Sequence, residues 1–119
     1  MNKVQALHEF WNSFGLSAYD ENSIPEEAEL PYITYEVATS DFGNLIQLSA
    51  SLWDKSYSWK TIQEKESEIG EAIGRGGKML AYDGGAFWIR KADTWAQRMS
   101  DEDASIRRIL LSIYIEYID

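Results

Sequence analysis

A glycine-rich segment near the middle of the chain, Gly74-Arg75-Gly76-Gly77-Lys78, has the composition of a phosphate-binding loop. In such a loop, backbone N–H groups and the lysine hold the phosphates, and the segment leads from a strand into a helix. Here Ala72 stands where the first glycine belongs, and Met79 stands where serine or threonine is required. The segment also leads from a helical pattern into a strand pattern. We therefore predict a glycine-rich helix end and no phosphate site.

A second candidate is the acidic segment in which Asp101, Asp103 and Ser105 have the spacing of the first ligands of a calcium loop. A calcium loop also needs glycine at its sixth position and glutamate at its twelfth. This chain has Ile106 and Ser112 at those positions. The pattern therefore predicts an ordinary acidic turn.

The single histidine, His8, lies on or beside the apolar face of the first predicted helix. No cysteine or second histidine can complete a usual zinc site with it, and no serine is placed to form a triad. We predict a partly buried structural histidine. Acidic residues number 20, so close pairs are expected by chance and give little support to a glycosidase-type pair. We predict no catalytic, cofactor-binding or metal-binding residue, and a protein that is not an enzyme.

The chain contains five tryptophans, which could form a platform for a sugar or a peptide. Core packing and subunit contacts explain them more economically, because aromatic side chains dominate both settings. These residues are Trp11, Trp53, Trp59, Trp88 and Trp95.

The composition points to an acidic globular protein. The 119 residues are 45% hydrophobic and carry a formal net charge of -9, with no cysteine. This length predicts one domain over residues 1–119. The negative charge repels nucleic-acid phosphates, so we expect no sequence-specific nucleic-acid binding. We expect no signal peptide and no membrane segment, and the lack of cysteine suits a reducing cytoplasm.

The first half of the chain predicts a helix, a loop and a strand pair. Val4, Leu7, Trp11 and Phe14 have helical spacing, with Gly15 as the stop. Residues 16–30 are polar and acidic and predict a solvated loop. Two alternating segments, residues 31–37 and a strand that begins at Leu45, flank turn residues 40–44 and predict a hairpin.

The second half predicts a helix and further strands. The helix spans about residues 58–73, with either Ser58 or a capping box at Thr61 and Glu64 as its start. Residues 78–82 and 86–91 flank Asp83-Gly84-Gly85 and predict a hairpin. Residues 94–99 form a weaker strand candidate. The alternation over residues 109–118 predicts a closing strand whose second face is also partly apolar, so helices or neighbouring chains would cover both sides.

These elements predict an α+β fold with a mainly antiparallel sheet of about five or six strands, two helices and the order α-β-β-α-β-β-β-β. The set resembles the small tail-terminator or tail-completion proteins of long-tailed bacteriophages, often labelled minor structural proteins in prophages. The resemblance covers nearly the whole chain through element order and pattern. Its segments are residues 31–37 (PYITYEV), residues 48–59 (LSASLWDKSYSW) with the helix that follows, and residues 105–117 (SIRRILLSIYIEY).

The resemblance implies a non-enzymatic protein that forms a ring, commonly a hexamer, at the head-proximal end of the tail tube. There the ring would end tube polymerisation and contribute to the head–tail connection. The implied partners are further copies of the chain, the tail tube protein and neck or head-completion proteins, and the implied location is the virion, assembled in the host cytoplasm. The candidate interface residues are Trp53, Asp54, Trp59, Arg108, Tyr114 and Glu116.

Two alternatives stay open at this point. One is another neck, head-completion or minor capsid protein with similar architecture. The other, from a different class, is an acidic inhibitor such as an immunity protein, an antitoxin or a DNA mimic. The net charge of -9 favours this alternative.

Overall fold

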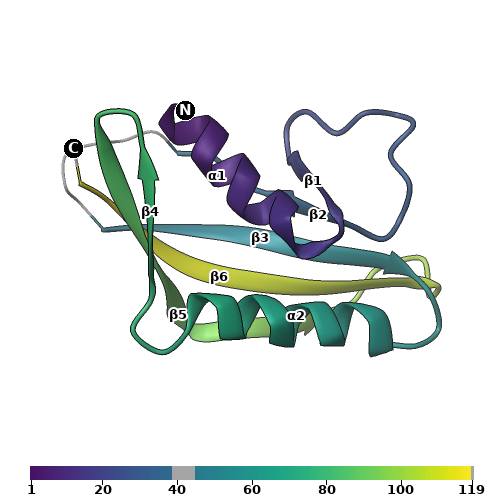
Figure 1. Ribbon diagram of the computed structural model, residues 1–119. Helices are drawn as coiled ribbons and strands as arrows, with labels where there is room; N and C mark the ends of the chain where they lie inside the picture. The colour runs from purple at the N-terminus through teal and green to yellow at the C-terminus, as the bar shows by residue number, and fades with distance from the viewer. Residues whose placement is uncertain (39–44, 119) are drawn as a thin grey trace.

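The computed structural model describes residues 1–38 and 45–118, and these ranges contain two α-helices and a six-stranded sheet (Figure 1). The strand order is β1-β2-β3-β6-β5-β4. Only β1 and β2 pair in parallel, and each other neighbouring pair is antiparallel. The elements are α1 (Lys3–Trp11), η1 (Asn12–Phe14), β1 (Ser17–Asp20), β2 (Tyr32–Tyr35), β3 (Leu45–Lys55), α2 (Lys60–Ile73), β4 (Lys78–Tyr82), β5 (Gly85–Met99) and β6 (Ile106–Ile118).

The predicted fold class is confirmed, and so is the antiparallel pair formed by β2 and β3. The register of that pair sets Tyr32 opposite Trp53 and Ile33 opposite Leu52. The turn predicted at residues 40–44 lies outside the described residues. The hairpin of β4 and β5 around Gly84 is confirmed, and the φ of 92° at Gly84 is why a glycine suits that turn.

The order of the elements along the chain differs from the predicted order in two places. The loop predicted over residues 16–30 contains β1, which joins the sheet edge in parallel with β2. A strand this short gives no readable alternation in the sequence. The weak strand predicted at residues 94–99 is the end of β5, which continues past a register shift between Lys91 and Ala96.

The helix ends also differ in part from the predictions. At α1, Asn2 and Gln5 form a capping box that was not predicted, and Gly15 ends the helical segment with a φ of 82°. At α2, the predicted capping box at Thr61 is wrong, because the helix begins at Lys60. The Ser58 hydroxyl instead accepts a hydrogen bond from the Lys60 backbone N–H at 3.1 Å.

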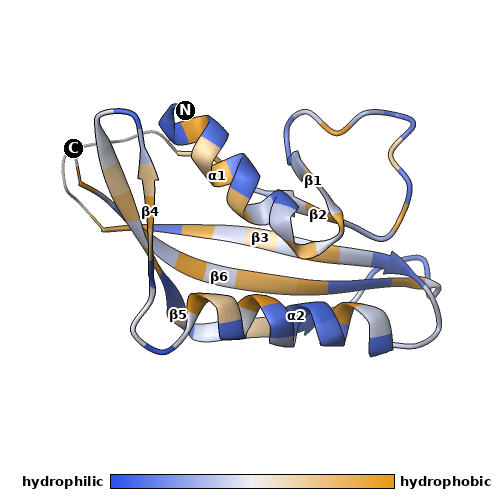
Figure 2. Ribbon diagram, in the orientation of Figure 1, coloured by the Kyte–Doolittle hydropathy of each residue, from blue (hydrophilic) through white to orange (hydrophobic). Residues whose placement is uncertain are grey.

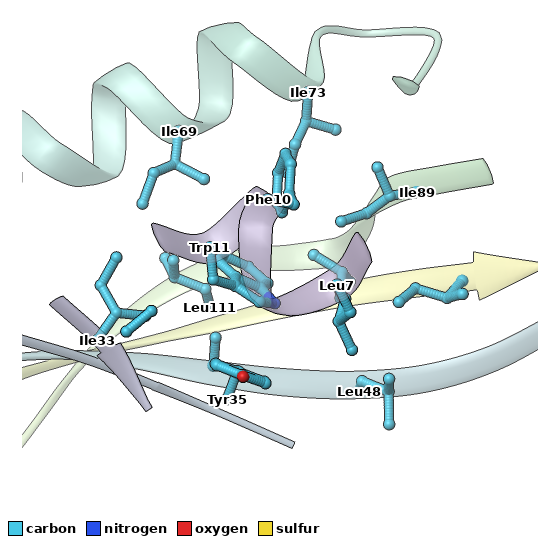
Figure 3. Packing of buried hydrophobic residues seen from close by; sticks show 14 of the residues in the cluster. Leu7, Phe10, Trp11, Ile33, Tyr35, Leu48, Ile69, Ile73, Ile89 and Leu111 are labelled. Carbon is cyan, nitrogen blue, oxygen red and sulfur yellow. The ribbon is translucent and has the colours of Figure 1, made fainter. Parts of the chain in front are cut away.

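The core lies between the sheet and the two helices. Leu7, Phe10 and Trp11 of α1 belong to the same buried hydrophobic cluster as Ile69 and Ile73 of α2 (Figure 3). Val4 was predicted on this apolar face, but its side chain is 42% exposed. Figure 2 shows that α2 carries separate hydrophobic and hydrophilic stripes, as expected for a helix with one face on a sheet. None of the described helices is long and apolar enough to cross a membrane.

Candidate functional site

The two faces of the sheet differ in what covers them. Along β6, Ile109, Leu111, Ile113, Ile115 and Tyr117 are buried and belong to the core beneath the helices. The alternate side chains project to the opposite side, which we call the open face because no helix of the described residues packs on it. Of the two predicted covers for the second side of the last strand, helices are therefore excluded among the described residues, and a neighbouring chain stays a prediction. The open face includes Tyr32, Trp53, Trp88, Arg90, Met99, Arg108, Tyr114 and Glu116.

One row of the open face joins aromatic and cationic side chains across neighbouring strands. The registers set Tyr32 opposite Trp53, Trp53 opposite Arg108, and Arg108 opposite Met99. The guanidinium carbon of Arg108 lies 4.6 Å from the ring centroid of Trp53, a cation–π distance. At the sheet edge, Tyr19 contacts the ring of Tyr32 edge to face at 5.6 Å.

Two hydroxyl groups beneath this row hold it in place. The Trp53 indole Nε1 donates to Thr34 Oγ1 at 2.9 Å, and the Arg108 Nε donates to Ser51 Oγ at 3.0 Å. Thr34 and Ser51 are 5% and 4% exposed, so the larger side chains cover them. The two hydrogen bonds fix the plane of the Trp53 ring and that of the Arg108 guanidinium. The result is a pre-organised surface of the composition found at binding hot spots.

A second stacked pair lies further along the same face. The Arg90 guanidinium lies 4.5 Å from the ring centroid of Trp88, and the Trp88 Nε1 donates to the Gly76 carbonyl at 3.0 Å. In this row, Leu45 of β3 and Met79 of β4 are 47% and 54% exposed. Trp88 and Arg90 are not among the interface residues predicted from the sequence. The signal that could have found it is the alternation of β5, which places Trp88 and Arg90 on one face.

Four of the six predicted interface residues lie on the open face. Trp53 and Arg108 are in contact, and Tyr114 and Glu116 lie on the same open face further along β6. Arg108 and Glu116 are roughly 27 Å apart along the strand, at about 3.4 Å per residue, so they do not pair within one chain.

The other two predicted interface residues, Asp54 and Trp59, lie away from the open face. Asp54 is 8% exposed and faces Arg107 in the register of β3 and β6, on the helix side of the sheet. Trp59 precedes α2, and its ring lies 4.7 Å from the Arg98 guanidinium and 5.3 Å from that of Arg107. Trp59 packs against the core, so its position differs in kind from that of Trp53.

His8 is more exposed than predicted. His8 is exposed, yet its Nδ1 lies 2.8 Å from the Tyr35 hydroxyl. Burial raises the pKa of Tyr35, and the negative charge of Asp20 raises that pKa further. These three residues border an open groove of about 750 Å³ beside α1.

The other two chemical candidates of the sequence have structural roles. Gly74 and Gly77 have φ values of 73° and 90° and lead from α2 to β4, as predicted for a helix end. Asp103 accepts hydrogen bonds from the hydroxyl and the backbone N–H of Ser105, which hold the pKa of that carboxyl below its ordinary value. In residues 1–38 and 45–118, no group of three or more His, Cys, Asp or Glu residues could hold a metal ion.

The chain thus has an α+β fold whose sheet presents one face to its surroundings. No family model and no curated protein matches the sequence. Among solved structures, the fold is similar to that of a chain in the "Virion of native gene transfer agent (GTA) particle". The TM-score is 0.73 at 15% sequence identity, over 98% of this chain and 95% of that chain. Such a likeness at low identity shows a shared fold.

Proposed function

We propose that the protein is a non-enzymatic structural component of a phage or phage-like virion, and that it is a tail terminator. It would form a ring of six copies at the head-proximal end of the tail tube and end tube polymerisation there. The observation that carries the proposal is the likeness in fold to a virion chain, which extends over 98% of this chain and 95% of the other. The resemblance of the sequence segments to tail terminators supports the position within the virion.

The open face supports the self-assembly part of the proposal. A closed ring needs a heterologous interface, in which one surface of a subunit meets a different surface of the next. Tyr, Trp and Arg side chains dominate the energetics of such interfaces, and the row of Tyr32, Trp53 and Arg108 supplies them on a rigid sheet. The net charge of -9 would allow DNA to pass through the ring without adhering to its wall.

The experiment that tests the proposal measures tail-tube length. Purified protein is mixed with polymerising tail-tube protein, and the tubes are measured by electron microscopy. We expect the protein to bind tube ends and to limit their length. Tubes that grow to the same length with and without the protein would overturn the tail-terminator assignment.

A deletion phage separates the terminator from its nearest alternative. Loss of a terminator gives overlong tails, whereas loss of a neck or head-completion protein gives tails of normal length detached from heads. Trp53→Ala, on the open face, should reproduce the overlong tails if subunit contacts are lost. Tyr57→Ala is the matched control, because Tyr57 is an aromatic residue that is 80% exposed in the connection between β3 and α2.

A further inference from the structure

We propose that the open face around Trp53 and Arg108 binds the acidic loop of a second copy of this chain. This loop, residues 21–30 between β1 and β2, is called the acidic arm below. The inference rests on the proposed function in one respect, namely that copies of the chain assemble with one another. It goes beyond that function because it names the two surfaces that meet and the charges that select them.

The receiving surface contains an arginine whose terminal nitrogens donate no hydrogen bond to any described residue. The Arg108 guanidinium is stacked on Trp53, and its Nε is engaged by Ser51. Among the described residues, no carboxylate forms an ion pair with Arg108. A guanidinium held in this way keeps a planar pair of N–H donors for a carboxylate, and its side chain has already lost its rotational freedom.

The surroundings of Arg108 favour a ligand that is both acidic and partly apolar. Tyr32 and Met99 flank the Trp53–Arg108 pair in the same row and offer half-buried apolar surface. Lys55 is exposed and follows Trp53 on the same side of β3, which adds a second positive charge. This end of the open face therefore carries two cations, Arg108 and Lys55, on a protein whose net charge is -9, although Asp103 lies near Lys55.

The acidic arm has the matching chemistry. Its charged residues are all acidic, namely Glu21, Glu26, Glu27 and Glu29. None of these carboxylates forms an ion pair within the described part of the chain. The arm also exposes 41% of Ile24, an apolar group that could contact the aromatic row. One segment thus carries carboxylates for Arg108 and an apolar side chain for its neighbours.

The arm is held in shape by its own turns. The Ser23 backbone N–H donates to the Asp20 carbonyl at 2.9 Å, and the Ala28 N–H donates to the Pro25 carbonyl at 3.1 Å. The Glu21 N–H donates to the Tyr35 carbonyl at 2.9 Å, which ties the base of the arm to β2. Figure 1 shows the arm as a loop that stands clear of the sheet beside β1 and β2. Little ordering is therefore required when a second copy binds it.

The acidic stripe of α2 from a second copy is the alternative ligand for the open face, and it matches that face less well. Its exposed residues are Lys60, Thr61, Glu64, Ser67, Glu68 and Glu71. The stripe includes a positive charge and no apolar side chain, so it would leave the aromatic part of the open face uncovered. Lys65 already engages Glu68 at 3.0 Å. Charge and apolar surface together therefore favour the arm.

Disulfide trapping tests the contact directly, because the chain has no cysteine of its own. One variant carries Glu27→Cys on the arm, and the other carries Gln97→Cys, an exposed position on β5 in the row next to Arg108. Each variant is purified reduced, the two are mixed, and the mixture is oxidised. We expect a mixed disulfide of twice the 13.7 kDa chain mass in preference to either homodimer.

Two controls make the result specific. Glu64→Cys on α2 replaces the arm cysteine in the first control and should trap Gln97→Cys poorly. The second control adds Arg108→Glu to the Gln97→Cys chain, which should lower the yield of mixed disulfide roughly tenfold through charge repulsion. Circular dichroism checks that each variant is folded. Equal trapping from Glu64→Cys, or a yield unaffected by Arg108→Glu, would overturn the proposal.

The disulfide trapping and the tube-length assay test the arm contact and the terminator function separately. Tubes of limited length without arm trapping would leave the terminator function in place and overturn the arm contact. Arm trapping that depends on Arg108, with tubes of unlimited length, would support the arm contact and overturn the tail-terminator position.

Discussion

The Arg108 guanidinium lies 4.6 Å from the ring centroid of Trp53, and the two residues face each other across β6 and β3. Each also donates a hydrogen bond to a buried hydroxyl, Arg108 to Ser51 and Trp53 to Thr34. The pair is therefore part of the fold and at the same time the centre of an uncovered surface. This dual position means that its contribution to stability must be measured before any variant is used to study assembly.

We predict that Trp53 and Arg108 are energetically coupled. Trp53→Leu, Arg108→Met and the double variant form a cycle whose coupling free energy should be about 0.5–1 kcal/mol, the usual value for a partly exposed cation–π pair. Urea unfolding of the four proteins gives the free energies. If the two single effects simply add, the pair makes no net contribution to stability and its geometry reflects the strand register alone.

Gly77 should be far less tolerant of alanine than Gly76. Gly77 has a φ of 90°, and an added Cβ would lie 2.4 Å from the Trp88 Nε1 and 2.7 Å from the Ile89 carbonyl. Strain and crowding together should lower the free energy of unfolding by about 2–4 kcal/mol in Gly77→Ala.

Gly76→Ala is the matched control for that substitution, because no heavy atom of the described residues, apart from Gly76 and its two chain neighbours, lies within 4 Å of the added Cβ. We expect Gly76→Ala to leave stability unchanged or to raise it by up to about 1 kcal/mol. Thermal and urea unfolding both report the difference. Equal tolerance at the two positions would contradict the close approach of Trp88 and the Gly77 backbone.

Much of the sheet could be predicted from the sequence because its central strands alternate. The alternation of β3 and β6 predicts which side chains face the core, and Asp83-Gly84 predicts the hairpin of β4 and β5. The short edge strand β1 could not be predicted, since its pairing depends on β2 rather than on a pattern of its own. The length of β5 was missed because a register shift interrupts its alternation after Lys91.

The candidate site could be predicted only in part. Trp53 and Arg108 were expected at an interface, but their contact follows from the antiparallel register of β3 and β6, which single-sequence reading does not fix. Trp59 and Trp53 were both predicted as interface residues, but only Trp53 lies on the open face. Two cations, Arg98 and Arg107, lie against the ring of Trp59. They come from β5 and β6 and are remote from Trp59 in the sequence.

Because of Tyr35, the free energy of unfolding should fall as the pH rises into the alkaline range. Its pKa is raised above the ordinary value of 10.0, first by burial and then by the charge of Asp20. The folded state therefore keeps the phenol proton at a pH where the unfolded state has lost it. The stabilisation that comes from the raised pKa of Tyr35 is fully present below the pKa of this group in the unfolded state. It is lost as the pH rises through the pKa of the group in the folded state.

Tyr35→Phe separates this effect from general alkaline unfolding. The stability difference between the parent protein and Tyr35→Phe should be constant below about pH 9 and should shift against the parent as pH rises beyond about 10. Urea unfolding across this range measures the difference, and the absorbance change of tyrosinate gives the titration itself. A difference that keeps the same value from about pH 9 to about pH 11 would contradict the raised pKa.

Trp59 should act through the fold, in contrast to Trp53. Its ring lies between Arg98 and Arg107, and the buried Arg107 Nε has no hydrogen-bond partner in residues 1–38 and 45–118. Trp59→Ala should therefore lower the free energy of unfolding by about 2–4 kcal/mol, somewhat less than for a tryptophan in a closed core. Tyr57→Ala should change it by no more than about 0.5 kcal/mol, because Tyr57 is 80% exposed and its carbonyl still accepts from Arg107. If Trp59→Ala is as mild as Tyr57→Ala, Trp59 does not stabilise the fold, and the sequence-based assignment of Trp59 to a subunit interface becomes the better explanation.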